Sequence, residues 1–173
     1  MVRTAEVPTD SEISKHLAGA HLFDAYEFST AGSERSALEI YIDIMAQTPN
    51  WVNRLMTARN RAVALFGLKD LGNLDDVDTR KEPESYRVGD RLGIFSILFL
   101  SEREVILVES DKHLDAKVSL CKTNSGHLDL AVMTTVIHVH NLLGCAYILP
   151  VWPVHKLIVP SQLNRSVRTP RGA

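Results

Sequence analysis

The fold is decided by GIFSILFLSEREVILVESDKHLDAKVSLCKTNSGHLDLAVMTTVIHVH, residues 93–140. Apolar and polar side chains alternate along this stretch, which is the two-residue period of a β-strand with one buried face. The alternation predicts four strands, at 93–100, 104–109, 114–121 and 128–140. Because a parallel crossover needs a dozen residues or more, connections this short predict antiparallel hairpins.

Two helices are predicted before this sheet and one after it. Ser36 and Glu39 have the spacing of a capping box and open the first helix. Thr48 followed by Pro49 is typical of an N-cap with proline at the first helical position, and it opens the second. The segment 142–165 is apolar and helical in character. Its three prolines are expected to break or kink this last helix: Pro150, Pro153 and Pro160.

The order of these elements predicts the architecture. A short aromatic strand at 25–28 comes first, then two helices, the antiparallel strands and the C-terminal helix. A curved antiparallel sheet needs a layer over its buried face, and the last helix can provide it. The sequence therefore predicts an α+β fold of the helix-grip or START-like kind, with two helices inserted after the first strand and a ligand cavity between sheet and C-terminal helix. Hotdog and cystatin-like folds are the alternatives.

Length and composition predict one domain. We expect it at 21–166, after an N-terminal segment (1–20) and before a basic tail (167–173), and we expect 69–91 to be a long surface loop. The net charge of −2 provides no basic field for a nucleic acid, so no nucleic-acid partner is expected. Two cysteines are too few for a disulfide framework and indicate a reducing compartment, the cytoplasm.

One stretch is long enough to raise the question of a membrane span. Residues 130–155 contain no Asp, Glu, Lys or Arg. Histidines and prolines interrupt the stretch, however, and its first half alternates like a strand. We predict no membrane span and expect an apolar small molecule as the partner, and a homodimer is compatible with the sequence.

The strand 128–140 carries the residues that we predict to be catalytic. Thr134, His138 and His140 share one face of it. We pair this strand with 114–121 so that even-numbered residues oppose even-numbered residues, which turns that face toward the cavity. Two imidazoles in an apolar cavity can act as base and acid, so His138 and His140 are the predicted catalytic pair. The alternative is a strand-end pair with one histidine buried and the other solvated.

Four further residues are predicted to bind the ligand. Arg59 on the second helix is expected to face an anionic group in the cavity, with a solvated helix face as the alternative. Trp152 and His155 lie where prolines interrupt the last helix, and with Thr134 they are expected to line the cavity.

Neither a cofactor nor a metal is expected. His113 or Asp115 could join the two strand histidines as metal ligands, but the preferred register turns Asp115 away. The sequence contains no GxGxxG, GxxxxGK[ST], GxSxG or HExxH motif, which argues against nucleotide cofactors, α/β-hydrolase chemistry and zinc proteases.

Three segments are distinctive when they are read together. They are PNWVNRLMTARNRAVALFGLK (49–69), ESDKHLDAKVSL (109–120) and TTVIHVHNLLGCAYILPVWPVHKLIVPSQLNRS (134–166). The combination resembles the bacterial domain-of-unknown-function family 2867, whose members occur alone or behind short-chain-dehydrogenase-like domains. The chain departs from the family pattern at three places, Ala116-Lys117, Gly144-Cys145 and Val154, which indicates a divergent member with a specialised ligand.

The resemblance implies no known chemistry, so the predicted function comes from the residues. The sequence predicts a cofactor-free domain that encloses an apolar small molecule. As an enzyme it would transfer protons in a cyclisation, dehydration or isomerisation of a hydrophobic or polyketide-like substrate, with His138 and His140 as base and acid. The alternatives are a non-catalytic carrier of a lipid or metabolite and an interaction module for a dehydrogenase partner.

Overall fold

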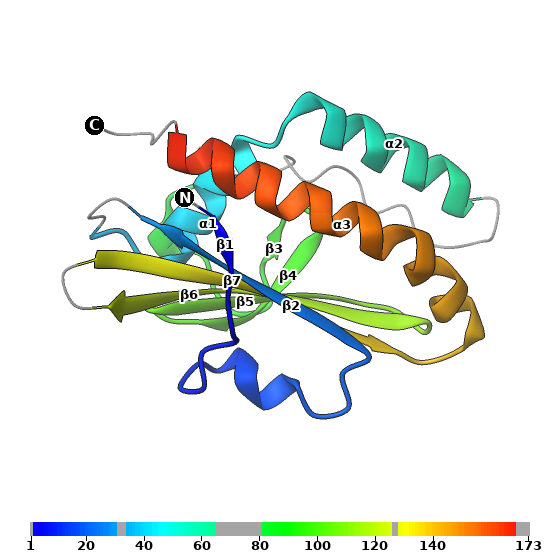
Figure 1. Cartoon of the computed structure of the whole chain (residues 1–173), viewed down its shortest axis with the longest axis horizontal. Coiled ribbons are helices and arrows are strands. Elements are labelled where there is room, and N and C mark those ends of the chain that lie inside the picture. Colours follow the sequence, from blue (N-terminus) through cyan, green and yellow to red (C-terminus); the bar gives the residue numbers. More distant parts are fainter. Residues whose placement is uncertain (1, 31–33, 65–80, 126–127, 169–173) are drawn as a thin grey trace.

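The structure, a computed structural model, describes residues 2–30, 34–64, 81–125 and 128–168. A curved antiparallel sheet of seven strands lies beneath two long helices (Figure 1). The strand order is β1-β2-β7-β6-β5-β4-β3. The strands are β1 (Arg3–Thr4), β2 (Leu22–Ser29), β3 (Arg91–Leu92), β4 (Phe95–Leu100), β5 (Glu104–Ser110), β6 (Leu114–Ser125) and β7 (Leu128–Val139). The predicted α+β fold, with an antiparallel sheet and a C-terminal helix, is confirmed.

The described residues also form three α-helices and two short 3-10 helices. They are α1 (Ala37–Ala46), α2 (Asn50–Ala64), α3 (Leu142–Arg168), η1 (Ile13–His16) and η2 (Pro83–Ser85). Helices α1 and α2 follow β2, as predicted. The predicted loop at 69–91 falls partly outside the described residues, and its described part contains η2 and the start of β3.

Helix α1 begins with the predicted capping box. The Ser36 hydroxyl accepts a hydrogen bond from the Glu39 amide at 3.3 Å, and the Ser36 amide donates to Glu39 Oε2 at 2.7 Å. The box holds the helix start because it satisfies two backbone N–H groups that the helix itself leaves free.

Removing this cap should weaken the fold measurably. We expect Ser36→Ala to lower the free energy of unfolding by about 1 kcal/mol, because the Glu39 amide loses its acceptor. Urea denaturation measures the change. Ser36→Thr keeps a hydroxyl that can cap and should restore most of the loss; equal destabilisation by both variants would contradict the capping role.

The predicted cap at Thr48 is wrong. The Thr48 hydroxyl donates to the Met45 carbonyl at 2.6 Å and accepts from Gln162 Nε2 at 2.9 Å. Both Thr48 and Gln162 are buried, so this hydroxyl ties the end of α1 to α3 instead of starting α2. A pairing with a residue 114 positions away leaves no local signal in the sequence.

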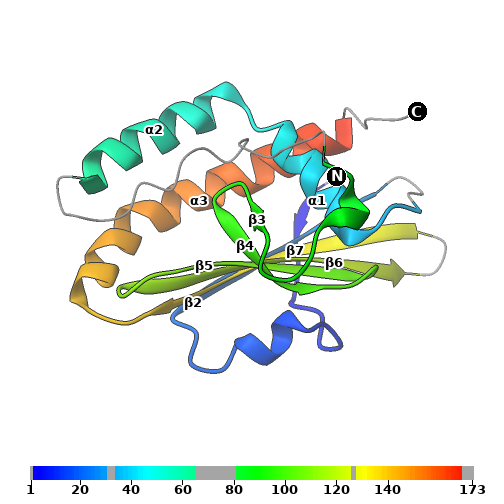
Figure 2. The ribbon, with the colours of Figure 1, turned by 180° about the vertical axis from the view of Figure 1, so that it is seen from behind.

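Helix α3 runs unbroken across the concave face of the sheet, although three prolines lie inside it (Figure 1). The prolines therefore do not break the helix, whereas the predicted alternative, a kink, agrees with the bend in its N-terminal part (Figure 2). The Asn141 side chain caps its start by accepting from the Gly144 amide at 3.1 Å. A Cβ atom at Gly144 would lie 2.3 Å from the His113 carbonyl oxygen, so glycine allows the first turn of α3 to pack against the chain just before β6.

The register of the β6–β7 pair determines which side chains face the cavity, and the predicted register is wrong by one residue. In the β6–β7 pair Asp115 lies opposite His138 and Ala116 opposite Ile137, so odd-numbered residues oppose even-numbered ones. The reason is the short hairpin connection: Ser125 pairs with Leu128, and two intervening residues impose this parity. All side chains of β7 consequently face the side opposite to the one predicted.

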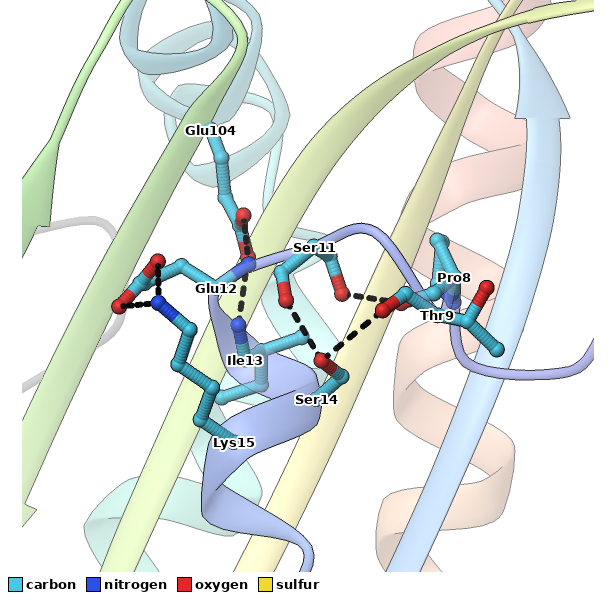
Figure 3. A network of polar contacts seen from close by, with 8 residues as sticks. All are labelled: Pro8, Thr9, Ser11, Glu12, Ile13, Ser14, Lys15 and Glu104. Carbon is cyan, nitrogen blue, oxygen red and sulfur yellow. Dashed lines mark hydrogen bonds and ion pairs between the residues drawn. The ribbon is translucent and has the colours of Figure 1, made fainter.

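The convex face of the sheet is covered by the N-terminal segment, for which the sequence predicts no role. Buried Ile13 of η1 packs there with Ile106 and Val136. Glu104, a buried β5 residue, accepts hydrogen bonds from the backbone amides of Glu12 at 2.6 Å and Ile13 at 3.0 Å (Figure 3). This carboxylate fastens the segment to the sheet.

Candidate functional site

A cavity of about 670 Å³ lies between the concave face of the sheet and the helices α2 and α3. Its volume is within the usual range for small-molecule sites. Most of its lining is aliphatic or aromatic, including Met56, Val118, Met133, Ile137, Val154 and Ile158. The cavity arises because β6 and β7 turn small or medium side chains toward α3, among them Ala116 and Thr135.

The cavity opens between α2 and α3. Residues of both helices line it and are also exposed to solvent: Leu55 and Ala58 on α2, and Leu143, Ala146 and Pro150 on α3. The rim is therefore apolar on both sides, as expected for an entrance that admits a hydrophobic molecule.

A half-buried histidine–carboxylate pair lies at the wall of this cavity. His155 of α3 lines the cavity, and its Nε2 lies 3.1 Å from Asp24 Oδ1 of β2. The two side chains are only 18% and 10% exposed, respectively. An ionised carboxylate can only accept, so this bond places the hydrogen on His155 Nε2 and leaves Nδ1 as the basic nitrogen of the neutral ring.

The neighbours of this pair hold it in place. The Trp152 ring stacks on the His155 ring, with centroids 5.0 Å apart and planes inclined by 8°. The second carboxylate oxygen of Asp24 is buried and has no hydrogen-bond partner among the described residues. Burial, and then the charge of Asp24, raise the pKa of the neighbouring Tyr26 hydroxyl, which keeps that group protonated.

A second polar group joins the two helices. Arg59 of α2 donates from Nε to the Tyr147 hydroxyl of α3 at 3.0 Å and from Nη1 to Asn60 Oδ1 at 2.6 Å. The guanidinium also lies 5.3 Å from the centre of the Tyr147 ring. Both Arg59 and Tyr147 line the cavity. Tyr147 and His155 are eight residues apart on one helix, which corresponds to about 12 Å along its axis.

Of the six predicted site residues, the cavity contains three: Arg59, Trp152 and His155. Thr134, His138 and His140 are not among them, because the register turns their side chains to the convex face. Thr134 is fully buried there.

His138 and His140 lie at a hollow of the convex face, beside η1, and not in the cavity. His138 Nε2 is 3.2 Å from the Ala18 carbonyl, and His140 Nε2 is 3.1 Å from Asp115 Oδ1. Burial raises the pKa of Asp115, but its hydrogen bonds to Ser110 and His140, together with the charges of His140 and Lys117, lower the pKa overall. The predicted placement of the two histidines is wrong, and the argument for an enclosed catalytic pair fails with it.

Asp24 and Tyr147 are two site residues that the sequence did not predict. Asp24 occupies a lone acidic position on the strand face formed by Leu22, Tyr26 and Phe28, and an acid on an otherwise apolar face was the available signal. The described residues include no group of three or more His, Cys, Asp or Glu side chains placed to hold a metal ion.

Comparisons with known proteins identify a family but no activity. The family model described as "Protein of unknown function (DUF2867)" matches residues 16–162. No curated protein matches the chain. Among solved structures, the chain is similar to CalU16 from Micromonospora echinospora at 13% sequence identity, with a TM-score of 0.33 over 83% of this chain and 80% of that one.

Proposed function

The chain belongs to the DUF2867 family, a family of unknown function. From the site alone, we propose that the protein binds a hydrophobic small molecule and catalyses acid–base chemistry on it without a cofactor. The observation that carries the proposal is the His155–Asp24 pair at the wall of an apolar cavity. The protein's two cysteines are free, which fits a reducing compartment, and we place the activity in the cytoplasm.

The proposed catalytic step is a proton transfer at His155. Nδ1 removes a proton from the bound substrate, and the Asp24 carboxylate stabilises the imidazolium that forms. The stacked Trp152 ring fixes the orientation of the imidazole, and the apolar walls exclude water, which strengthens the interaction between the charges. Cyclisation, dehydration and isomerisation all include such a step.

The distance between the two polar groups suggests the kind of substrate. A molecule that reaches both Tyr147 and His155 spans about 12 Å, so it needs an extended apolar skeleton. It also needs an oxygen function near Arg59 and Tyr147, whose donors can hold a carbonyl or carboxylate. A polyketide-like chain meets both requirements.

Ligand binding is testable with an uncharged fluorescent probe, N-phenyl-1-naphthylamine. We expect it to bind the protein with one-to-one stoichiometry, and we expect Ala116→Phe to weaken binding by at least about tenfold, because the added ring fills the cavity. Fluorescence titration measures the affinity.

The matched control is Leu98→Phe, which enlarges an exposed side chain outside the cavity. It should bind the probe like the unmodified protein. Equal affinity in all three proteins would place the probe elsewhere and contradict a ligand site in this cavity. Probe binding without any catalysis would favour the carrier.

A further inference from the structure

The two helices that enclose the cavity form a basic layer without a single acid. Helices α2 and α3 contain six Lys and Arg residues and no Asp or Glu: Arg54, Arg59, Arg61, Lys156, Arg165 and Arg168. Because the whole chain has a net charge of −2, the rest of the chain carries −8. All of the six except Arg59 are exposed, and none of these five forms a salt bridge within the described part of the chain.

The same layer exposes large apolar side chains. Leu142, Leu149 and Leu157 of α3 are 86%, 72% and 67% exposed, and Trp51 of α2 is 41% exposed. The three leucines are seven or eight residues apart, which places them along one side of the helix. Exposed leucines among cations that form no salt bridge are typical of helices that lie in a membrane interface.

We propose that the α2–α3 layer docks on the surface of an anionic lipid bilayer. Basic side chains near such a surface are attracted by its negative potential, and the exposed leucines and Trp51 can enter the boundary between headgroups and acyl chains. A second copy of the chain fits this layer less well, since a symmetric contact would bring two acid-free basic surfaces together.

Helix α3 lies on the membrane in this proposal and does not cross it. Helix α3 is long and apolar enough to cross a membrane, since an 18-residue window of it has a mean hydropathy of 1.6, and only 11% of that window is buried in the protein. The inner side of the helix is fixed in the fold through Val159 and Leu163 in the core and through the Gln162–Thr48 hydrogen bond. Only the outer side is free to meet lipid.

Docking in this orientation turns the apolar rim of the cavity toward the bilayer. Leu55 and Leu143 both line the cavity and reach solvent on the same layer. A hydrophobic ligand could then pass between membrane and cavity without crossing water. This last consequence rests on the proposed function, whereas docking itself does not.

The experiment is sedimentation of the protein with unilamellar vesicles of two compositions. We expect binding to phosphatidylcholine vesicles that contain phosphatidylglycerol, little binding to pure phosphatidylcholine, and release from the anionic vesicles at high salt. Leu149→Ser with Leu157→Ser, and separately Arg54→Glu with Lys156→Glu, should each lower the partition coefficient about tenfold or more. These four side chains do not line the cavity, so probe binding should be retained.

The control variants lie outside the helical layer. Phe23→Ser removes an apolar side chain that is 55% exposed on β2, and Arg87→Glu reverses an exposed charge; both should bind vesicles like the unmodified protein. Absence of binding to anionic vesicles, or equal losses in control and layer variants, would overturn the proposal. So would a dimer in sedimentation equilibrium that the leucine variants dissociate, because the face would then be an interface between copies.

Discussion

Replacing His155 with alanine should lower catalysis of 5-nitrobenzisoxazole ring opening by about 100-fold or more. This apolar molecule needs only one base: removal of its carbon-bound proton breaks the N–O bond and releases a coloured nitrophenolate. The proposed base is Nδ1 of His155, a cavity-lining residue of α3 whose Nε2 lies 3.1 Å from Asp24 Oδ1. Absorbance of the product gives the rate, relative to the reaction in buffer.

Two kinds of variant separate the base from the cavity that surrounds it. Asp24→Asn keeps the size of the side chain and removes its charge, so we expect a smaller loss, about tenfold, because the imidazolium is less stabilised. His138→Ala and His140→Ala should have unchanged rates, since both histidines lie on the convex face. Binding of the fluorescent probe checks that the cavity remains intact.

An unmodified protein that binds the probe and does not accelerate ring opening would exclude His155 as an effective base and leave the carrier as the function. If His138→Ala or His140→Ala lost the ring-opening activity while His155→Ala kept it, the catalytic site would lie on the convex face.

The two-residue alternation of apolar and polar side chains was enough to predict the antiparallel sheet. Alternation in 93–140 depends only on which residues are apolar, and the capping box at Ser36 is local, so both could be read without a structure. The register between β6 and β7 could not be predicted in this way, because the alternation of apolar and polar residues identifies the buried face only when the other face of the strand is exposed. In β7 every residue from Ala131 to Ile137 is buried: one face packs under α3 and the other under η1.

The candidate site was predictable in part for the same kind of reason. Trp152 and His155 could be found because prolines mark the helix around them, and Arg59 because it is a cation on an amphipathic helix. Asp24 is 131 residues from His155, and only the pairing of β2 with β7 brings the acid under α3. The partner of His155 therefore depends on the order of the strands in the sheet, which cannot be predicted from a local sequence pattern.

Glu104→Ala should destabilise the protein by about 3 kcal/mol, the largest stability change that we expect from a single substitution. Glu104 is 4% exposed, and its carboxylate accepts hydrogen bonds from the Glu12 and Ile13 amides (Figure 3). It also accepts one from the Ser119 hydroxyl at 2.7 Å. Without it these donors stay buried with no acceptor, and each costs more unpaired than an ordinary hydrogen bond contributes. Urea denaturation gives the difference in the free energy of unfolding, when both proteins are fitted with the same dependence of that free energy on urea concentration.

The substitution Glu102→Ala is the matched control, because Glu102 is an exposed glutamate two residues away and its side chain bonds to no described residue. It should change stability by less than about 0.5 kcal/mol. Glu104→Gln should fall between the two, since its amide oxygen can accept from one amide while its NH₂ group faces another donor.

Hydrogen exchange at the Ile13 amide should accelerate in Glu104→Ala beyond the global loss of stability, because the N-terminal segment loses its anchor to β5 and exposes Ile106 and Val136 beneath it. If Glu104→Ala and Glu102→Ala were equally stable, the N-terminal segment would have to be held by its apolar contacts alone, and the buried carboxylate would have no structural role.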